Sequence, residues 1–137
     1  MTQADLDHQF MQQAIGQAQL AALAGEVPVG AVLVRDGKVI SKAFNQPINH
    51  HDPSAHAEML ALRAAAKAEE NYRLPGSTLY VTLEPCSHTG KTPPCMDALI
   101  KAKVKKIFIA MQDPNPLVSG QGIQKLKEAH IEVEVGV

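Results

Sequence analysis

Three strand-like segments separated by helix-like segments constrain the fold of this chain more than any other feature of its sequence. The strand-like segments are residues 77–83 ("STLYVTL"), 105–111 ("KKIFIAM") and 131–137 ("IEVEVGV"). Helices are predicted between them, over residues 94–103, which begin with a proline suited to a first helical turn, and over residues 123–130. Strands that are joined by helical crossovers pair in parallel, so we expect these three to form a parallel sheet.

The first half of the chain predicts two more strands and two more helices. Residues 6–24 place apolar side chains at near-helical spacing, and Gly25 would end that helix. Residues 27–44 hold two apolar runs about a central Asp-Gly pair, which is typical of an antiparallel hairpin. After a polar loop, Ser54 suits the N-cap of a helix over residues 54–70. The predicted fold is α/β: one domain (1–137) with a mixed five-stranded sheet and helices on both faces.

The composition excludes several classes of function. With 137 residues, of which 45% are hydrophobic, the chain suits one domain with an aliphatic core. Its net charge of −1 is not that of a protein that grips a long stretch of nucleic acid. One basic cluster, "KAKVKK" at 101–106, is interpreted as solvated residues between a helix and a strand rather than as a phosphate patch. The polar N-terminus does not resemble a signal peptide, and no apolar run approaches the roughly 20 residues that cross a membrane, so we expect a cytoplasmic protein.

Two cysteines, Cys86 and Cys95, are the strongest pointer to chemistry. Disulfides are rare in the cytoplasm, which weakens a disulfide interpretation and leaves buried thiols or a metal site. Cys86 comes just after a predicted strand, whereas Cys95 and His56 stand near the starts of predicted helices. In open α/β sheets such positions gather at the carboxyl ends of the parallel strands, and a helix N-terminus favours the thiolate that binds metal.

A zinc ion held by these three residues would keep a fourth position open for water, as catalytic zinc sites do. Zinc lowers the pKa of such a water to about 7. Glu58, two residues after His56, would then carry protons between that water and a substrate. Two other interpretations stay open on spacing alone. Either His88 is a fourth ligand in a structural site, or the chain holds no metal and Glu58 is an acid favoured by the helix dipole.

The pattern "H-A-E" at 56–58, followed by "P-C-x8-C" at 85–95, resembles the signature of the zinc-dependent cytidine deaminase superfamily. The resemblance implies a three-layer α/β/α cytidine-deaminase-like fold with zinc on His56, Cys86 and Cys95. It also implies that Glu58 shuttles protons while an exocyclic amine is hydrolysed from a nucleobase-type ring and released as ammonia. The backbone near Ala57 would help to hold the ring.

Different parts of the chain resemble two branches of that superfamily. Residues 10–85 resemble bacterial tRNA adenosine deaminase in "GEVPVGAVLV", "NQPINHHDPSAHAEMLALR" and "TLYVTLEPC". Residues 80–137 resemble the deaminase domain of the bifunctional riboflavin-pathway enzyme, which acts on a diaminopyrimidine ribosyl phosphate, in "TLEPCSHTGKTPPC" and "AMQDPNP". A natural hybrid and an engineered chimera are both compatible with this pattern.

The chain departs from each branch. The tRNA enzymes have "P-C-x-x-C", where this chain has a spacer of eight residues, and they extend past its last residue into a basic helix. Without that helix, a nearly neutral protein is expected to bind RNA weakly. Against the riboflavin branch, Glu26 stands where an asparagine is expected and Asn45 stands where that branch has a histidine. We also expect no reductase domain.

The resemblance assigns substrate contacts to two walls of the predicted pocket. Asn45 corresponds to the base-reading asparagine of the tRNA enzymes, whose amide both donates and accepts hydrogen bonds. His88, Lys91, Asp113 and Asn115 match positions that line the pocket toward the ribose and phosphate in the riboflavin branch. For Asp113 and Asn115 a plain turn interpretation stays open, because "DPNP" is a strong turn by itself.

Three functions follow, in order of preference. The first is deamination of diaminohydroxyphosphoribosylaminopyrimidine, a small ribosylated nucleotide, in riboflavin biosynthesis. The second is deamination of adenosine to inosine in the anticodon loop of tRNA. The third is a catalytically silent zinc-binding protein. The resemblance also implies a homodimer, because enzymes of both branches build their sites near subunit interfaces.

Overall fold

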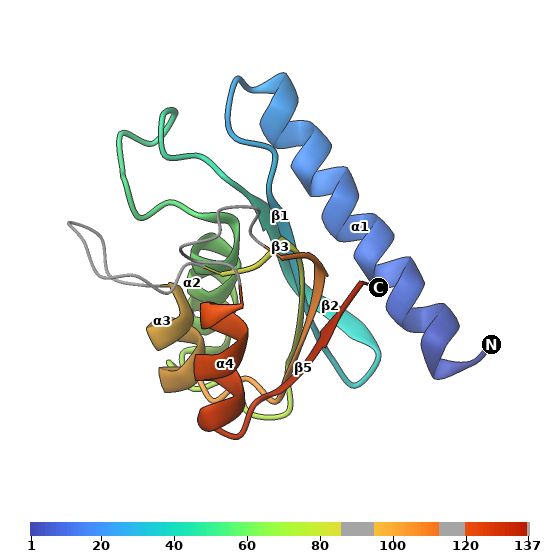
Figure 1. Cartoon of the computed structure of the whole chain (residues 1–137). Coiled ribbons are helices and arrows are strands. Elements are labelled where there is room, and N and C mark those ends of the chain that lie inside the picture. Colours follow the sequence, from blue (N-terminus) through green and yellow to red (C-terminus); the bar gives the residue numbers. More distant parts are fainter. Residues whose placement is uncertain (86–94, 113–119, 137) are drawn as a thin grey trace.

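The computed structural model of the chain describes residues 1–85, 95–112 and 120–136 (Figure 1). The elements of these residues follow in the predicted order: α1 (Gln3–Leu23), β1 (Gly30–Arg35), β2 (Lys38–Phe44), α2 (Ala57–Glu69), β3 (Thr78–Leu83), α3 (Cys95–Lys101), β4 (Lys106–Met111), α4 (Gln121–Glu128) and β5 (Glu132–Val135).

The strands form a five-stranded sheet in the order β2-β1-β3-β4-β5. β1 and β2 pair antiparallel, as the hairpin pattern predicts. β3, β4 and β5 pair in parallel, as their helical crossovers predict. The two parts of the sheet meet where β1 pairs antiparallel with β3, so that Leu33 lies opposite Leu79. This pairing places the N-terminal hairpin beside the parallel strands.

Helices cover both faces of the sheet, which confirms the predicted three-layer α/β/α arrangement (Figure 1). α1 packs on one face, where the Tyr80 ring lies between Phe10 and Phe108 with ring centroids 5.3 and 4.8 Å away. α2, α3 and α4 lie on the other face (Figure 1). Alternate residues of β1 point to the two layers, Val32 toward α1 and Leu33 toward α2, as the two-residue period of a strand requires.

Two contacts hold α1 close to the sheet. At Gly30 the helix approaches so closely that an added Cβ would lie 2.0 Å from the Ala14 carbonyl oxygen and 2.5 Å from the Ala18 backbone nitrogen. Both are atoms of the helix backbone, so no side chain larger than hydrogen fits at this position. Nearer the start of the helix, the hydroxyl of buried Tyr80 donates to Asp7 Oδ1 at 2.6 Å.

Two predicted helix starts are wrong, and local hydrogen bonds explain both. α1 starts before residue 6, because Thr2 Oγ1 accepts from the Asp5 N–H (3.2 Å) and Asp5 Oδ2 accepts from the Thr2 N–H (3.0 Å). Ser54 is not the N-cap of α2: its N–H and its hydroxyl both donate to Asp52 Oδ1, at 2.9 and 2.7 Å. His56, expected inside the first turn, is the N-cap instead.

The third helix begins at Cys95 and ends at Lys101, two residues before the predicted end. Lys103 has a positive φ of 60°, which turns the chain toward β4. Pro94, the expected first-turn proline, lies outside the described residues.

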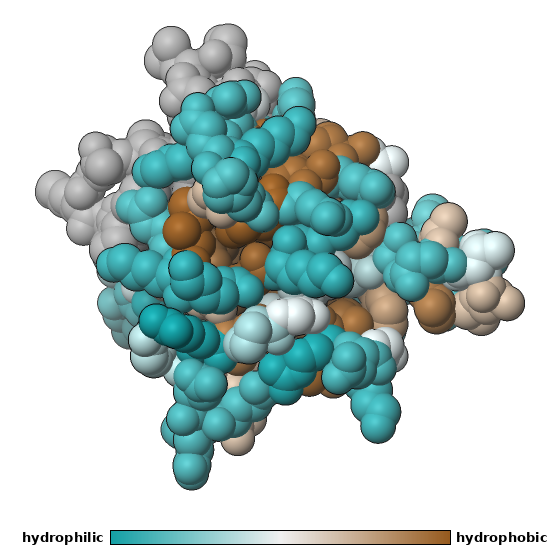
Figure 2. Space-filling model, turned by 90° about the horizontal axis from the view of Figure 1, so that it is seen from below, coloured by the Kyte–Doolittle hydropathy of each residue, from teal (hydrophilic) through white to brown (hydrophobic). Residues whose placement is uncertain are grey.

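The basic cluster at 101–106 lies on the α3–β4 connection, at the end of the sheet away from the N-terminus of α2 (Figure 1). Lys101, Lys103 and Lys105 are exposed, in agreement with their interpretation as solvated residues. This end of the molecule presents a mostly hydrophilic surface, with apolar residues visible between the polar ones (Figure 2). Among the helices of the described residues, none combines the length and apolar character needed to cross a membrane.

Candidate functional site

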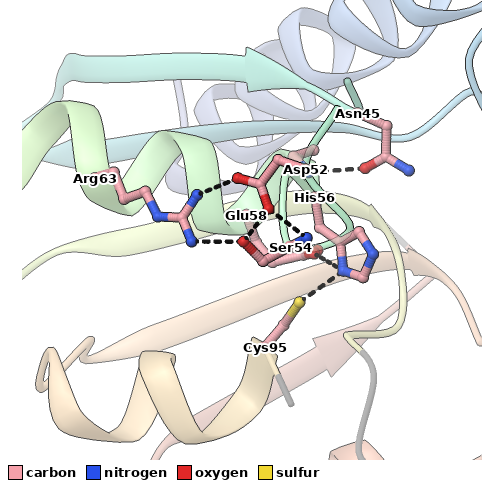
Figure 3. Close-up of polar contacts among 8 residues, drawn as sticks. Asn45, Asp52, Ser54, His56, Glu58, Arg63 and Cys95 are labelled. Atoms are coloured by element: carbon pink, nitrogen blue, oxygen red, sulfur yellow. Dashed lines mark hydrogen bonds and ion pairs between the residues drawn. The ribbon is translucent and has the colours of Figure 1, made fainter. Parts of the chain in front are cut away.

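His56 and Cys95 meet at the starts of two neighbouring helices (Figure 3). His56 is the N-cap of α2 and Cys95 is the first residue of α3. Because α2 and α3 pack on each other, His56 Nδ1 and Cys95 Sγ lie 3.0 Å apart, although 39 residues separate them in the sequence. Cys95 is buried, and its place at a helix N-terminus favours the ionised sulfur.

Glu58 joins this pair from the first turn of α2. Its side chain is buried, and Oε1 lies 3.9 Å from His56 Nδ1. The ligand-type atoms of His56, Glu58 and Cys95 all lie within 4.8 Å of one another. A glutamate two residues after a helix N-cap therefore points its carboxylate back toward the capping residue.

The donor atoms of His56 and Cys95 fit a zinc ion. Zinc binds imidazole nitrogen at about 2.0–2.1 Å and sulfur at about 2.3 Å, which places tetrahedral ligand atoms roughly 3.5 Å apart. The observed separation of 3.0 Å needs only a small opening to reach that value. A nitrogen and a sulfur donor, both held by helix starts, form a suitable half of a site for this metal.

Asn45 lies on the other side of His56, directly after β2 (Figure 3). It is buried, its N–H donates to the Val29 carbonyl at 3.0 Å, and its Oδ1 accepts from the Ala57 N–H at 2.7 Å. The Ala57 N–H thus fixes Asn45 at the start of α2, and the contact of the backbone near Ala57 with the ring stays a prediction.

Asn45, His56 and Glu58 border a cavity of about 290 Å³. Apolar side chains and a proline form part of its wall, and polar and acidic side chains form the rest; the lining residues are Val27, Val29, Asn45, Pro47, His56, Glu58, Leu83 and Glu84. Its size suits a single heterocyclic ring, and Glu58 lies beside His56 in its wall.

Sequence reasoning did not identify the roles of two buried acids: Glu84, which lines this cavity, and Glu26, which precedes the lining residue Val27 in the chain. Glu84 Oε1 accepts from the Gly120 N–H at 2.9 Å, so it links the end of β3 to the start of α4. Glu26 accepts hydrogen bonds from Ile48 and Asn49 of the β2–α2 connection. The only available signal for Glu26 was its departure from the asparagine of the riboflavin branch.

The remaining predicted site residues lie outside the described residues: Cys86, His88, Lys91, Asp113 and Asn115. Cys86 directly follows Pro85, the last described residue after β3. The carboxyl end of β3 is therefore at the same edge of the sheet as the cavity, which Leu83 and Glu84 line.

Comparisons with known proteins agree with this arrangement. Residues 4–111 match the family model described as the cytidine and deoxycytidylate deaminase zinc-binding region. That range contains His56, Glu58 and both cysteines. Zinc is therefore the metal that both the family and the donor atoms indicate.

Two similar proteins are a riboflavin biosynthesis protein and a deaminase/reductase of known structure. The riboflavin biosynthesis protein RibD of Aquifex aeolicus is 47% identical over 109 residues, which are 80% of this chain and 28% of that protein. A crystal structure from Thermotoga maritima, a diaminohydroxyphosphoribosylaminopyrimidine deaminase/5-amino-6-(5-phosphoribosylamino)uracil reductase, is 43% identical, with a TM-score of 0.84 over 97% of this chain and 37% of that one. This chain spans about a third of the length of these relatives.

A third similar structure comes from work on tRNA:A34 deaminases, which perform A-to-I editing at the wobble position of transfer RNA. It is 37% identical, with a TM-score of 0.81, and the match covers 94% of this chain and 92% of that one.

Proposed function

Because the chain belongs to the cytidine and deoxycytidylate deaminase family, we propose that it is a zinc-dependent hydrolytic deaminase of a nucleobase-type ring. His56, Cys86 and Cys95 would hold the metal, and Glu58 would carry protons. The observation that supports this proposal most is the approach of His56 Nδ1 to Cys95 Sγ at 3.0 Å, with the buried Glu58 carboxylate beside them in a ring-sized cavity.

The chemistry divides between the metal and the chain. When bound, zinc lowers the pKa of a water to about 7 and so supplies hydroxide at neutral pH. Glu58 accepts a proton as water adds to the ring carbon that bears the amine, and it donates a proton to the departing nitrogen. A carbon–oxygen bond forms and the carbon–nitrogen bond breaks, so that the ring amine becomes a carbonyl and ammonia leaves. Only 4% of Glu58 is exposed, which limits proton exchange with bulk water.

Asn45 would orient the ring. The Ala57 N–H holds Asn45 Oδ1, so the NH₂ group is the end of the amide that is available to donate to an acceptor on the ring edge. Val29 and Leu83 line the same cavity and offer apolar surface to the ring. The amide specifies the ring edge, and the apolar walls favour the dry environment in which charge–dipole interactions are strong.

For the substrate, we propose diaminohydroxyphosphoribosylaminopyrimidine. The identities of 47% to a riboflavin biosynthesis protein and of 43% to a deaminase/reductase named for this substrate support it, as does the eight-residue spacing between Cys86 and Cys95. In this proposal Lys91 binds the phosphate, Asp113 and Asn115 bind the ribose hydroxyls, and His88 lines the same region. A net charge of −1 is compatible with a small nucleotide as the partner.

A second candidate is the deamination of adenosine to inosine in a tRNA anticodon loop. The TM-score of 0.81 to a tRNA:A34 deaminase structure, with 92% of that chain covered, favours it. Asn45 in place of the histidine of the riboflavin branch also favours it. Because both candidate substrates are compatible with the family fold, a measurement of turnover must distinguish between them.

A panel assay of ammonia release tests the proposal. Zinc-loaded protein is incubated with the diaminopyrimidine nucleotide, free nucleosides and an anticodon stem-loop. We expect turnover of the diaminopyrimidine nucleotide. Turnover of the stem-loop alone would establish the second candidate, and zinc binding without ammonia from any substrate would establish the silent zinc protein. A homodimer and a cytoplasmic location stay predictions, which light scattering and cell fractionation would check.

A further inference from the structure

Glu26 is a buried acid that the proposed chemistry does not use. It lies in the connection between α1 and β1, and only 6% of it is exposed. Its carboxylate accepts hydrogen bonds from the Ile48 N–H (3.2 Å), the Asn49 N–H (2.8 Å) and Asn49 Nδ2 (2.6 Å). The three donors belong to the β2–α2 connection, more than twenty residues further along the chain.

The two connections that Glu26 joins form the mouth of the cavity. Val27, next to Glu26, and Pro47, next to Ile48, both line the cavity. Val27 is 63% exposed, so it stands at the entrance rather than at the floor. Both connections lie at the same end of the molecule (Figure 1). The hydrogen bonds of Glu26 therefore set the separation of two wall residues that are their immediate neighbours in the chain.

The catalytic side of the cavity is held by other contacts. Where the β2–α2 connection leaves β2, the Asn45 N–H donates to the Val29 carbonyl and the Gln46 N–H donates to the Ala55 carbonyl. Where the same connection approaches α2, Arg63 contacts Asp52 and Ser54 (Figure 3). Loss of Glu26 is thus expected to loosen the tip of the connection while its two ends stay fixed.

The chemistry of the contact requires a carboxylate. Three N–H donors converge on its two oxygens, whereas a glutamine would offer one oxygen and turn an NH₂ group against an N–H donor. Burial by itself raises the pKa of Glu26, but the hydrogen bonds from Asn49 and Ile48 outweigh it and hold the pKa below its usual range. Glu26 is accordingly ionised at neutral pH.

We propose that Glu26 is a positioning residue that sets the width of the cavity mouth by clamping the β2–α2 connection to the α1–β1 connection. This inference rests on the proposed function for its kinetic consequence: Glu26 governs the binding of the ring substrate, whereas His56, Glu58 and Cys95 govern its conversion. Its structural part, the clamp, stands on the hydrogen bonds alone.

Amide hydrogen exchange of the full chain tests the clamp without any activity measurement. In Glu26→Gln, exchange at Ile48 and Asn49 is expected to be at least tenfold faster, while exchange within α2 is unchanged. Glu70→Gln is the matched control, because it makes the same charge change at an exposed residue just after α2. Glu26→Asp, which keeps two acceptor oxygens, should recover part of the protection. Exchange at Ile48 and Asn49 that is the same in Glu26→Gln and in the control would overturn the proposal.

Kinetics test the consequence for the substrate. With whichever substrate releases ammonia, Glu26→Gln is expected to raise KM about tenfold and to change kcat less than about twofold. The KM of Glu26→Asp should lie between that of the unaltered protein and that of Glu26→Gln. A fall in kcat at unchanged KM would contradict the positioning role. If the unaltered protein releases no ammonia, the proposed function fails, and the exchange data decide the clamp by themselves.

Discussion

Substitution of Asn45 is expected to separate its role in folding from its role toward the substrate. Asn45 Oδ1 accepts the Ala57 N–H at 2.7 Å, and both residues are buried. Asn45→Ala removes the acceptor and leaves the N–H at the start of α2 without this bond. A buried donor that loses its partner costs about 1–3 kcal/mol, so we expect the free energy of unfolding to fall by about 2 kcal/mol.

Asn45→Asp keeps an oxygen that can accept the Ala57 N–H, beside the positive end of α2, so we expect most of the stability to remain. It lacks the NH₂ group that would donate to the ring. Loss of such a bond, with an oxygen turned against an acceptor, is worth about 1.5–3 kcal/mol, or roughly 10- to 150-fold in kcat/KM. The aspartate variant should therefore be stable but poorly active, and the alanine variant deficient in both respects.

Urea unfolding followed by circular dichroism, together with ammonia release, measures the two effects. Asn71→Ala is the matched control, because it removes an exposed bond of the same type, from the Arg73 N–H to Asn71 Oδ1, and should change stability by less than about 0.5 kcal/mol. Asn45 does not have these two roles if Asn45→Ala is as stable as the control variant, or if Asn45→Asp retains full kcat/KM.

Three further changes test the site and the packing around it. Glu58→Gln should retain stoichiometric zinc by elemental analysis but lose at least about 100-fold in kcat, since it keeps its size but cannot carry protons; loss of the metal would contradict the proton-carrying role. Tyr80→Phe removes the buried 2.6 Å bond to Asp7 and should cost about 2 kcal/mol in chemical unfolding, whereas Tyr72→Phe, at an exposed tyrosine, should cost almost nothing. Burial and the bond to Asp7 raise the pKa of Tyr80, so the folded chain holds the hydroxyl proton more tightly than the unfolded chain does. The contribution of this proton to the free energy of unfolding is complete below about pH 10 and is lost as the pH rises further. Tyr80→Phe should therefore lack this part of the alkaline loss of stability. Gly30→Ala should lower the free energy of unfolding by about 3 kcal/mol, because its Cβ would lie 2.0 Å from helix backbone; an unchanged thermal midpoint would contradict the close approach of α1.

The predictions that the structure and the comparisons confirm depend on local patterns and on the order of the elements. Short apolar runs indicate strands, and helical segments between strands imply parallel pairing, so the mixed sheet and its two helical layers could be predicted. Membership of the cytidine deaminase family could be predicted because "H-A-E" and the two cysteines are specific in residue type and order. The helix starts were less predictable, because Asp52 competes for Ser54 and leaves His56 as the N-cap.

Residue types and their order already indicate the available chemistry: two thiols and at least one imidazole suited to zinc, a carboxylate two residues after His56, and an overall charge near zero. These properties belong to residue types and short spacings, so no fold is needed to state them. The tertiary structure decided which groups meet. His56 and Cys95 lie 3.0 Å apart because α2 and α3 pack on one face of the sheet, and Glu26 reaches Asn49 because two connections end at the same edge. Such contacts join distant parts of the chain, and no local pattern encodes the distance between them.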